Sequence, residues 1–75
     1  MPMTHSFSVI LEPQPGGGFT VLVPALPGCL TQGETLDEAL TNAREAIGLH
    51  LRALARDGDP IPQETAPPQL ATLDV

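Results

Sequence analysis

A single amphipathic segment in the second half of the chain limits its fold more than any other feature of the sequence. Apolar residues recur there every three or four positions, at Leu36, Leu40, Ala43, Ile47, Leu51 and Leu54, and are flanked by Ala39, Ala46, Leu49 and Ala53. This spacing keeps them on one side of an α-helix, which must be covered by another element. Thr35 and Glu38 have the spacing of a capping box, and Gly58 is a typical C-terminal cap. The pattern predicts a helix over residues 36–57, about 33 Å long.

The first half of the chain has the alternating pattern of short β-strands. Apolar side chains occupy every second position of residues 5–12 and 19–23, at Phe7, Val9, Leu11, Phe19, Val21 and Val23, although Ile10 falls on the polar side. The prolines and glycines of residues 13–18 predict a hairpin connection between these strands. Pro27 and Gly28 suit the centre of a type II turn that leads into a third strand over residues 29–33. Short connections predict an antiparallel meander.

These elements predict an α+β fold in which a small antiparallel sheet packs on one long helix, in the order β-β-β-α-β. The last strand is expected at about residues 70–75, with a disordered end as the alternative. We expect one domain over residues 1–75, with its core at about 5–65, because a chain of 75 residues is too short for a second core. The helix is longer than the strands, so its far end is expected to extend beyond the sheet and to offer a contact surface for another chain.

The chain lacks the covalent and metal supports that stabilise many domains of this size. Its one cysteine, Cys29, excludes an internal disulfide. A structural zinc site takes about four Cys or His ligands, whereas the chain offers Cys29, His5 and His50. We therefore expect no bound metal or other cofactor. Self-association, as a dimer or a tetramer, is the support that remains.

The charge of the chain limits the partners that it can have. Nine acidic residues, three arginines and no lysine give a net charge of −6. Nucleic-acid binding depends on Lys and Arg that neutralise phosphates, so no direct binding to nucleic acid is expected. An acidic surface favours basic partners, although it also keeps a protein in solution without any partner.

The sequence indicates a cytoplasmic protein. It has no stretch of about 20 apolar residues that could span a membrane. Residues 1–8 lack the basic region followed by an apolar region that defines a signal peptide. A lone cysteine fits a reducing compartment.

We predict no catalytic, cofactor-binding or metal-binding residues. Cys29 could pair with a histidine as a nucleophile, but a buried structural cysteine and a surface histidine are the expected roles. The acids Glu34, Asp37 and Glu38 lie where the helix dipole favours negative charge, so we expect them to cap the helix rather than to hold a metal. The glycines at positions 16–18 do not form a phosphate loop, because no lysine follows them and the next element is a strand.

The remaining charged and aromatic side chains indicate no nucleic-acid site. Arg44, Arg52 and Arg56 share one side of the predicted helix, where we expect a solvated surface or salt bridges. Phe7 and Phe19 are expected in the core, so the chain offers no aromatic platform for stacked bases.

Several short motifs resemble those of the HicB-like antitoxins. The strand and turn VLVPALPGC at residues 21–29 is followed by TQGET at 31–35, DEAL at 37–40, NA at 42–43, EAI at 45–47 and IP at 61–62. The resemblance covers about residues 5–65. It implies a β-β-β-α-β domain that is similar to a truncated ribonuclease H fold without its catalytic acids. It also implies a partner, a small basic HicA-like ribonuclease toxin that the domain binds and blocks.

We therefore expect a non-enzymatic antitoxin-like binding module of a type II toxin–antitoxin pair. Full antitoxins of this family usually carry a second, DNA-binding domain. No such domain is expected after residue 65, which argues against operator binding. The alternative is a stand-alone oligomeric domain with a regulatory or ligand-binding role, and an enzyme is the third possibility. A neighbouring gene for a small basic protein would distinguish the first from the second.

Overall fold

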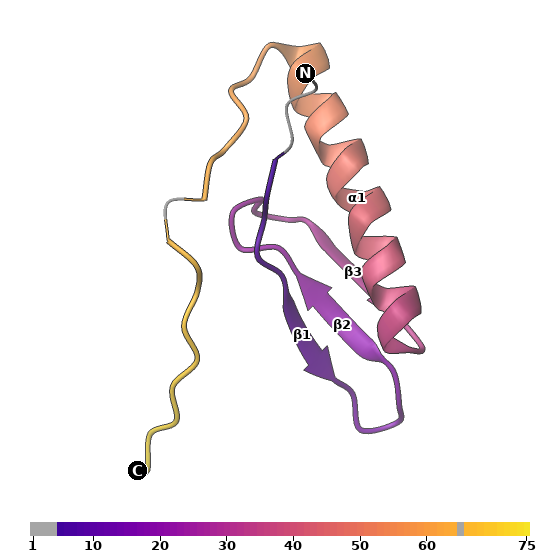
Figure 1. Cartoon of the computed structure of the whole chain (residues 1–75), viewed down its shortest axis with the longest axis vertical. Coiled ribbons are helices and arrows are strands. Elements are labelled where there is room, and N and C mark those ends of the chain that lie inside the picture. The colour runs from indigo at the N-terminus through magenta and orange to yellow at the C-terminus, as the bar shows by residue number, and fades with distance from the viewer. Residues whose placement is uncertain (1–4, 65) are drawn as a thin grey trace.

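The computed structural model describes residues 5–64 and 66–75 and shows a three-stranded antiparallel sheet packed against one helix (Figure 1). The strands β1 (Ile10–Pro13), β2 (Phe19–Leu22) and β3 (Leu30–Gly33) follow one another in the sheet, and the helix α1 (Leu36–Asp57) comes after them. The α+β class, the antiparallel meander and the long helix are confirmed. Residues 1–4, part of the segment expected to hold no signal peptide, and residue 65, the end of the expected core, lie outside the described residues.

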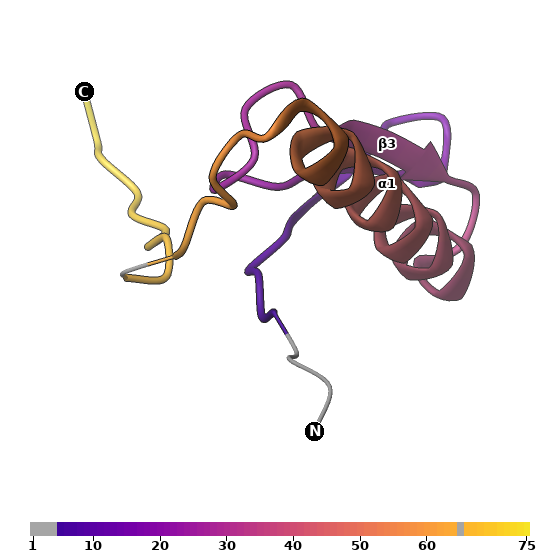
Figure 2. The same ribbon diagram turned by 90° about the horizontal axis from the view of Figure 1, so that it is seen from above.

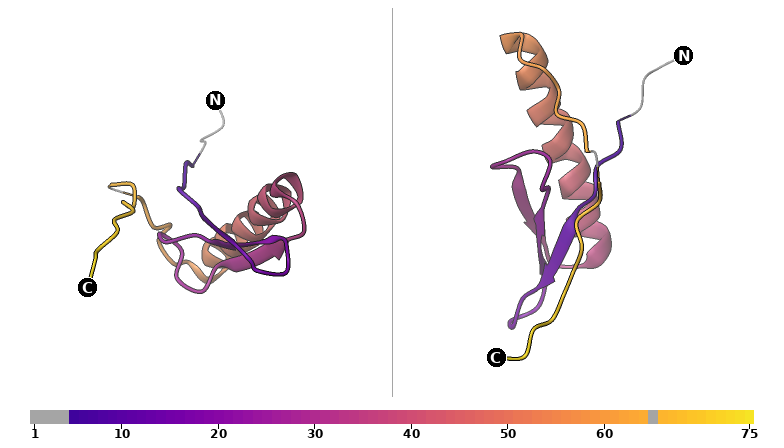
Figure 3. Two further views of the ribbon diagram at one scale, coloured as in Figure 1. Left: turned by 90° about the horizontal axis from the view of Figure 1, so that it is seen from below. Right: turned by 90° about the vertical axis from the view of Figure 1, so that its left-hand side faces the viewer.

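Sheet and helix form two layers. The helix α1 packs across β3 and β2 on one side of the sheet (Figure 2). The opposite side of the sheet carries no helix, as the right-hand view of Figure 3 shows. The second half of α1 extends beyond the strands, as its length predicts (Figure 1).

The first strand is shorter than predicted. β1 begins at Ile10, whereas the alternating pattern starts near His5. The antiparallel register pairs Ile10 with Leu22, so the position opposite Ser8 is occupied by Pro24. A proline has no N–H to donate to the ladder, and the pairing therefore ends there.

The two turns within the sheet form as predicted. In the hairpin loop between β1 and β2, Gly17 and Gly18 adopt positive φ angles of 100° and 85°. The second turn is closed by the Cys29 N–H, which donates to the Leu26 carbonyl at 2.9 Å. Gly28 lies at its centre with a φ of 85°, the conformation that a type II turn requires.

Both ends of α1 are capped at the residues that the sequence predicts. The Thr35 hydroxyl accepts a hydrogen bond from the Glu38 N–H at 3.1 Å. At the other end, Gly58 has a φ of 74° and donates to the Ala55 carbonyl at 3.2 Å. Glycine reaches this left-handed conformation at no steric cost, so the helix stops there.

The side of α1 that packs on the sheet agrees with the predicted stripe at Ala43, Ile47 and Leu51 but departs from it in the first turns of the helix. Ala39 and Ala43 are buried, whereas Leu36 and Leu40 stay 46% and 41% exposed. The cause is the short distance between helix and sheet, because a Cβ placed on Gly33 would lie 2.4 Å from the Ala39 nitrogen. Only small side chains fit at this contact, so α1 presents its alanines to β3 and leaves two leucines at its flank.

The core consists of two adjoining clusters. The first joins Val21 to Ala39 and Ala43, and the partly buried Val9, Leu11 and Phe19 pack against it. The second joins Val23, Leu26 and Cys29 to Phe7, Val9, Ala46, Ile47 and Leu51. The turn after β2 therefore fills the space under the second half of α1, and both phenylalanines contribute to the core as predicted.

The prediction of a fourth strand is wrong. Residues 66–75 hold no strand, and Leu70 and Leu73 are 94% and 83% exposed. The alternation of apolar residues at 70–75 does not by itself supply a backbone partner, and the four prolines between residues 59 and 69 cannot pair the chain that leads there. The segment is held near β1 by a side chain instead: the carboxylate of Glu64 accepts from the Ser8 N–H at 2.8 Å and from the Ser8 hydroxyl at 2.7 Å.

Candidate functional site

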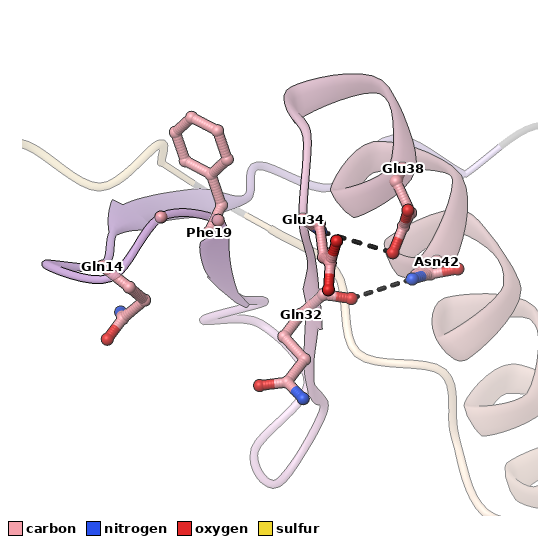
Figure 4. Close-up of a pocket in the computed structure, with 9 residues that line it drawn as sticks. Gln14, Phe19, Gln32, Glu34, Glu38 and Asn42 are labelled. Atoms are coloured by element: carbon pink, nitrogen blue, oxygen red, sulfur yellow. Dashed lines mark hydrogen bonds between the residues drawn. The ribbon is translucent and has the colours of Figure 1, made fainter.

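The candidate site is a polar hollow of about 500 Å³ at the end of the domain where α1 begins, hereafter the helix-start hollow. Its walls are the hairpin loop between β1 and β2, the start of β2, the end of β3 and the first two turns of α1 (Figure 4). Figure 4 shows the labelled side chains around it: Gln14, Phe19, Gln32, Glu34, Glu38 and Asn42.

The carboxylate of Glu38 is fixed by the helix start. Its Oε1 atom accepts a hydrogen bond from the Glu34 N–H at 3.3 Å. The capping box predicted the N–H of Thr35 as the donor, so the bond lies one residue earlier than expected. Glu38 therefore caps the helix, as predicted. Glu34 and Asp37 are exposed beside it.

A hydrogen bond from Asn42 links the helix to the edge strand β3. Its Nδ2 atom donates to the backbone carbonyl of Gln32 at 2.8 Å. Across the hollow, a Cβ on Gly18 would lie 2.9 Å from the Gly33 carbonyl oxygen, so the hairpin loop also lies close to the end of β3. The sequence carries no local signal for the Asn42 bond, because its partners are ten residues apart and meet only once helix and sheet have packed.

The lining of this hollow is polar and acidic. Its lining contains carboxylates, amides, glycines and one phenyl ring, and it includes no Ser, Cys or His side chain. Such a surface can accept hydrogen bonds from, and attract, a cationic group on another molecule. Within residues 5–64 and 66–75, no three His, Cys, Asp or Glu side chains gather in a way that could hold a metal ion.

Cys29 lies outside the helix-start hollow. It is the last residue of the turn before β3, whereas the sequence predicted it as the first residue of that strand. Its side chain is 8% exposed and packs in the cluster with Val23 and Leu26. Burial raises the pKa of its thiol above the ordinary value of 9.0. This environment suits a structural cysteine and disfavours the reactive thiolate form.

The remaining candidate side chains are spread over the surface. The exposed ring of His5 stacks with Phe7 at a centroid distance of 6.4 Å, and His50 is half-buried on α1. The arginines of α1 are exposed, and Arg56 forms a surface ion pair with Asp57, with 3.6 Å between Nε and Oδ1.

The fold is an α+β domain in which one helix covers one side of a small sheet. The helix-start hollow gives one end of this domain an acidic surface. The chain belongs to the family described as HicB_like antitoxin of bacterial toxin-antitoxin system, which it matches over residues 7–73. It is 43% identical over 60 residues to a UPF0150 protein of Thermoplasma acidophilum, an alignment that covers 80% of this chain and 87% of that protein.

Two further relatives show the range of proteins that contain this domain. A UPF0150 protein of Synechocystis is 38% identical over 80% of this chain and 76% of its own length. The protein named Antitoxin HicB 1 of Photorhabdus laumondii is 39% identical over 75% of this chain, but the match covers only 36% of that antitoxin. In the part of the chain that the structure describes, no helix is long and apolar enough to cross a membrane.

Proposed function

We propose that this chain is a non-enzymatic, cytoplasmic antitoxin-like module that binds a small basic HicA-like ribonuclease toxin and blocks it. The observation that carries the proposal is the match to the HicB_like antitoxin family over residues 7–73. The similarity to an antitoxin of Photorhabdus laumondii supports the same role.

The charge distribution supports a basic partner. Glu12, Glu34, Asp37 and Glu38 are all exposed at the end of the domain that holds the helix-start hollow. The first arginine, Arg44, comes only after two turns of α1, so among the described residues the charged side chains at this end are all acidic. A cationic protein is attracted to such a surface and meets it faster than a neutral protein would.

The test is a neutralisation assay. The purified chain is mixed with the product of an adjacent small basic gene, and RNA degradation is followed. We expect the chain in excess to stop degradation and to cleave no RNA by itself. Glu34→Gln removes one exposed charge at the acidic end and should weaken neutralisation, whereas Glu45→Gln removes one exposed charge in the middle of α1 and serves as the matched control. A ribonuclease that stays fully active at excess of this chain excludes the proposal.

A stand-alone oligomeric domain is the second candidate function. The two UPF0150 relatives favour it, because the aligned regions make up 87% and 76% of those proteins and leave little room for a second domain. Co-purification from the native cell, followed by mass spectrometry, separates the two candidates. A basic ribonuclease in the complex supports the first, and the chain alone as an oligomer supports the second.

A further inference from the structure

A second hollow, of about 410 Å³, lies between residues 5–9 and the middle of α1, hereafter the flank hollow. It arises because α1 packs on β3 and β2 but not on β1. Residues 5–9, which lead into β1, and the helix therefore diverge on the same side of the sheet, as the left-hand view of Figure 3 shows. Small-molecule sites have volumes of roughly 300–1,000 Å³, so this hollow is large enough for such a ligand.

Most of the lining of the flank hollow is apolar. Phe7 and Val9 contribute to one wall, and Leu40, Ala43 and Ile47 contribute to the other. Leu40 is 41% exposed and belongs to neither core cluster, so the domain itself leaves part of this apolar surface in water. A hydrocarbon group in the hollow would remove that surface from water, which is favourable.

The polar side chains of the lining can all donate hydrogen bonds to an anion. Arg44 is a permanent cation with five N–H donors, and His5 and Ser6 add a ring N–H and a hydroxyl. No carboxylate is among the lining residues. Within the part of the chain that the structure describes, Arg44 forms no ion pair. The helix positions three and four residues away from it hold no acid: Leu40, Thr41, Ile47 and Gly48.

The acids around the flank hollow do not occupy Arg44. Glu45 follows it in the sequence but points about 100° away around the helix. Asp37 is on the same side of α1 but about 10 Å earlier along the axis, beyond the distance of about 8 Å over which salt screens charges. Glu64 does not line the hollow, and its carboxylate already accepts hydrogen bonds from the N–H and the hydroxyl of Ser8.

We propose that the flank hollow binds a small carboxylic acid with a short hydrocarbon chain. The guanidinium of Arg44 holds the carboxylate through paired hydrogen bonds, for which its planar shape is suited. The hydrocarbon chain lies between Val9 and Leu40. From Leu40 to Ile47 the wall of α1 is about 10 Å long, which matches a chain of about six carbons. A partner helix, with its usual three to four turns, would be longer than this wall.

The first experiment titrates the isotope-labelled protein with hexanoate and follows its backbone amide signals by NMR. The signals of Val9, Ala43 and Ile47 should shift until they saturate, and those of the helix-start hollow should stay in place. Hexanamide has the same shape without the charge, and acetate has the charge without the chain. Each should bind at least about tenfold more weakly than hexanoate, because a hydrogen bond to a charged group and a buried chain both contribute to affinity. Equal binding of either probe, or shifts confined to other parts of the domain, would overturn the proposal.

The second experiment removes each part of the site in turn. Arg44→Gln and Leu40→Gln should each lower the affinity for hexanoate about tenfold. Arg52→Gln and Leu49→Gln are the matched controls, because these residues are exposed on α1 outside the hollow, and both should bind hexanoate like the wild type. The amide spectrum of each variant shows whether its fold is retained.

An equal loss of affinity in a variant and its control would contradict the assignment of the site. A peptide with a free C-terminal leucine that binds more than about tenfold tighter than hexanoate would also overturn the proposal, because the hollow would then belong to a protein partner. The titrations require no toxin, so their result is independent of the neutralisation assay and of the acidic end that the assay tests.

Discussion

The hydroxyl of Thr35 satisfies a backbone N–H that the helix itself leaves unpaired. Thr35→Ala removes the acceptor of the 3.1 Å bond from the Glu38 N–H and should lower the free energy of unfolding by about 1 kcal/mol. Thr41→Ala is the control, since Thr41 is exposed inside α1 and alanine favours the helix there. A thermal melt of Thr35→Ala that matches the wild type would show that the cap contributes nothing.

Cys29 should make stability depend on pH only in the alkaline range. Because burial raises the pKa of its thiol, the folded protein keeps this proton at pH values where the unfolded chain loses it. Stability is then constant below the unfolded pKa and falls as the pH rises through the folded value. The chain has no lysine or tyrosine, so few other groups titrate in this range.

The measurement is the denaturant midpoint at about pH 7.5 and about pH 10.5, below and above an ordinary thiol pKa. The wild type should lose stability between these values, whereas Cys29→Ala should show a much smaller change. Partner binding at neutral pH should be the same in both proteins, because the thiol is buried in the core. Loss of binding with the fold retained would assign Cys29 a functional role.

At the scale of elements, the contact between α1 and β3 depends on one glycine. A Cβ on Gly33 would lie 2.4 Å from a backbone nitrogen of α1, whereas a Cβ on Gly48 would meet nothing within 4 Å. Gly33→Ala should therefore destabilise the fold by about 3 kcal/mol, the upper range for overpacking. Gly48→Ala should stabilise it by about 1 kcal/mol, because glycine is costly inside a helix.

Chemical denaturation of the two glycine variants provides the comparison. The mutations are the same in chemistry and differ only in the space around the new methyl group. Equal stability of Gly33→Ala and the wild type would mean that α1 can move away from β3 at little cost.

The elements differ in how well local sequence determines them. The bounds of α1 and the turn at Pro27 and Gly28 follow from caps and backbone preferences within a few residues, and both were predicted. The packing of the first turns of α1 was not, because it depends on the space at Gly33, which only the packed sheet defines. The start of β1 was also missed, since it is set by Pro24, two residues after the end of β2. The predicted last strand failed because an apolar alternation does not supply a backbone partner.

The candidate site was less predictable than the fold. The sequence indicated that Glu38 caps the helix, and the structure confirms this role. The helix-start hollow itself combines the hairpin loop, β3 and α1, and its Asn42 bond joins residues that no local pattern relates. Its position therefore required the tertiary structure.

At the scale of the whole molecule, the charge of the chain should control how fast it meets a basic partner. With a net charge of −6, association with a cationic ribonuclease should slow as salt is added, whereas dissociation should change much less. Screening acts over about 8 Å at physiological ionic strength, so distant acids affect the approach more than the final contact. Stopped-flow mixing at several salt concentrations measures both rates, and a salt-independent association rate would contradict this prediction.

The order of contacts in the domain has a consequence for how the chain folds. Each strand pairs with the next one in the sequence, and α1 packs on the strand that precedes it. Only short loops must close before stable contacts form, so the entropy lost in each step is small. Contacts between neighbouring elements keep the relative contact order below that of sheets built from distant strands, which favours faster folding. The bond from Ser8 to Glu64 spans 56 residues, so it can form only after the hairpins and the helix are in place.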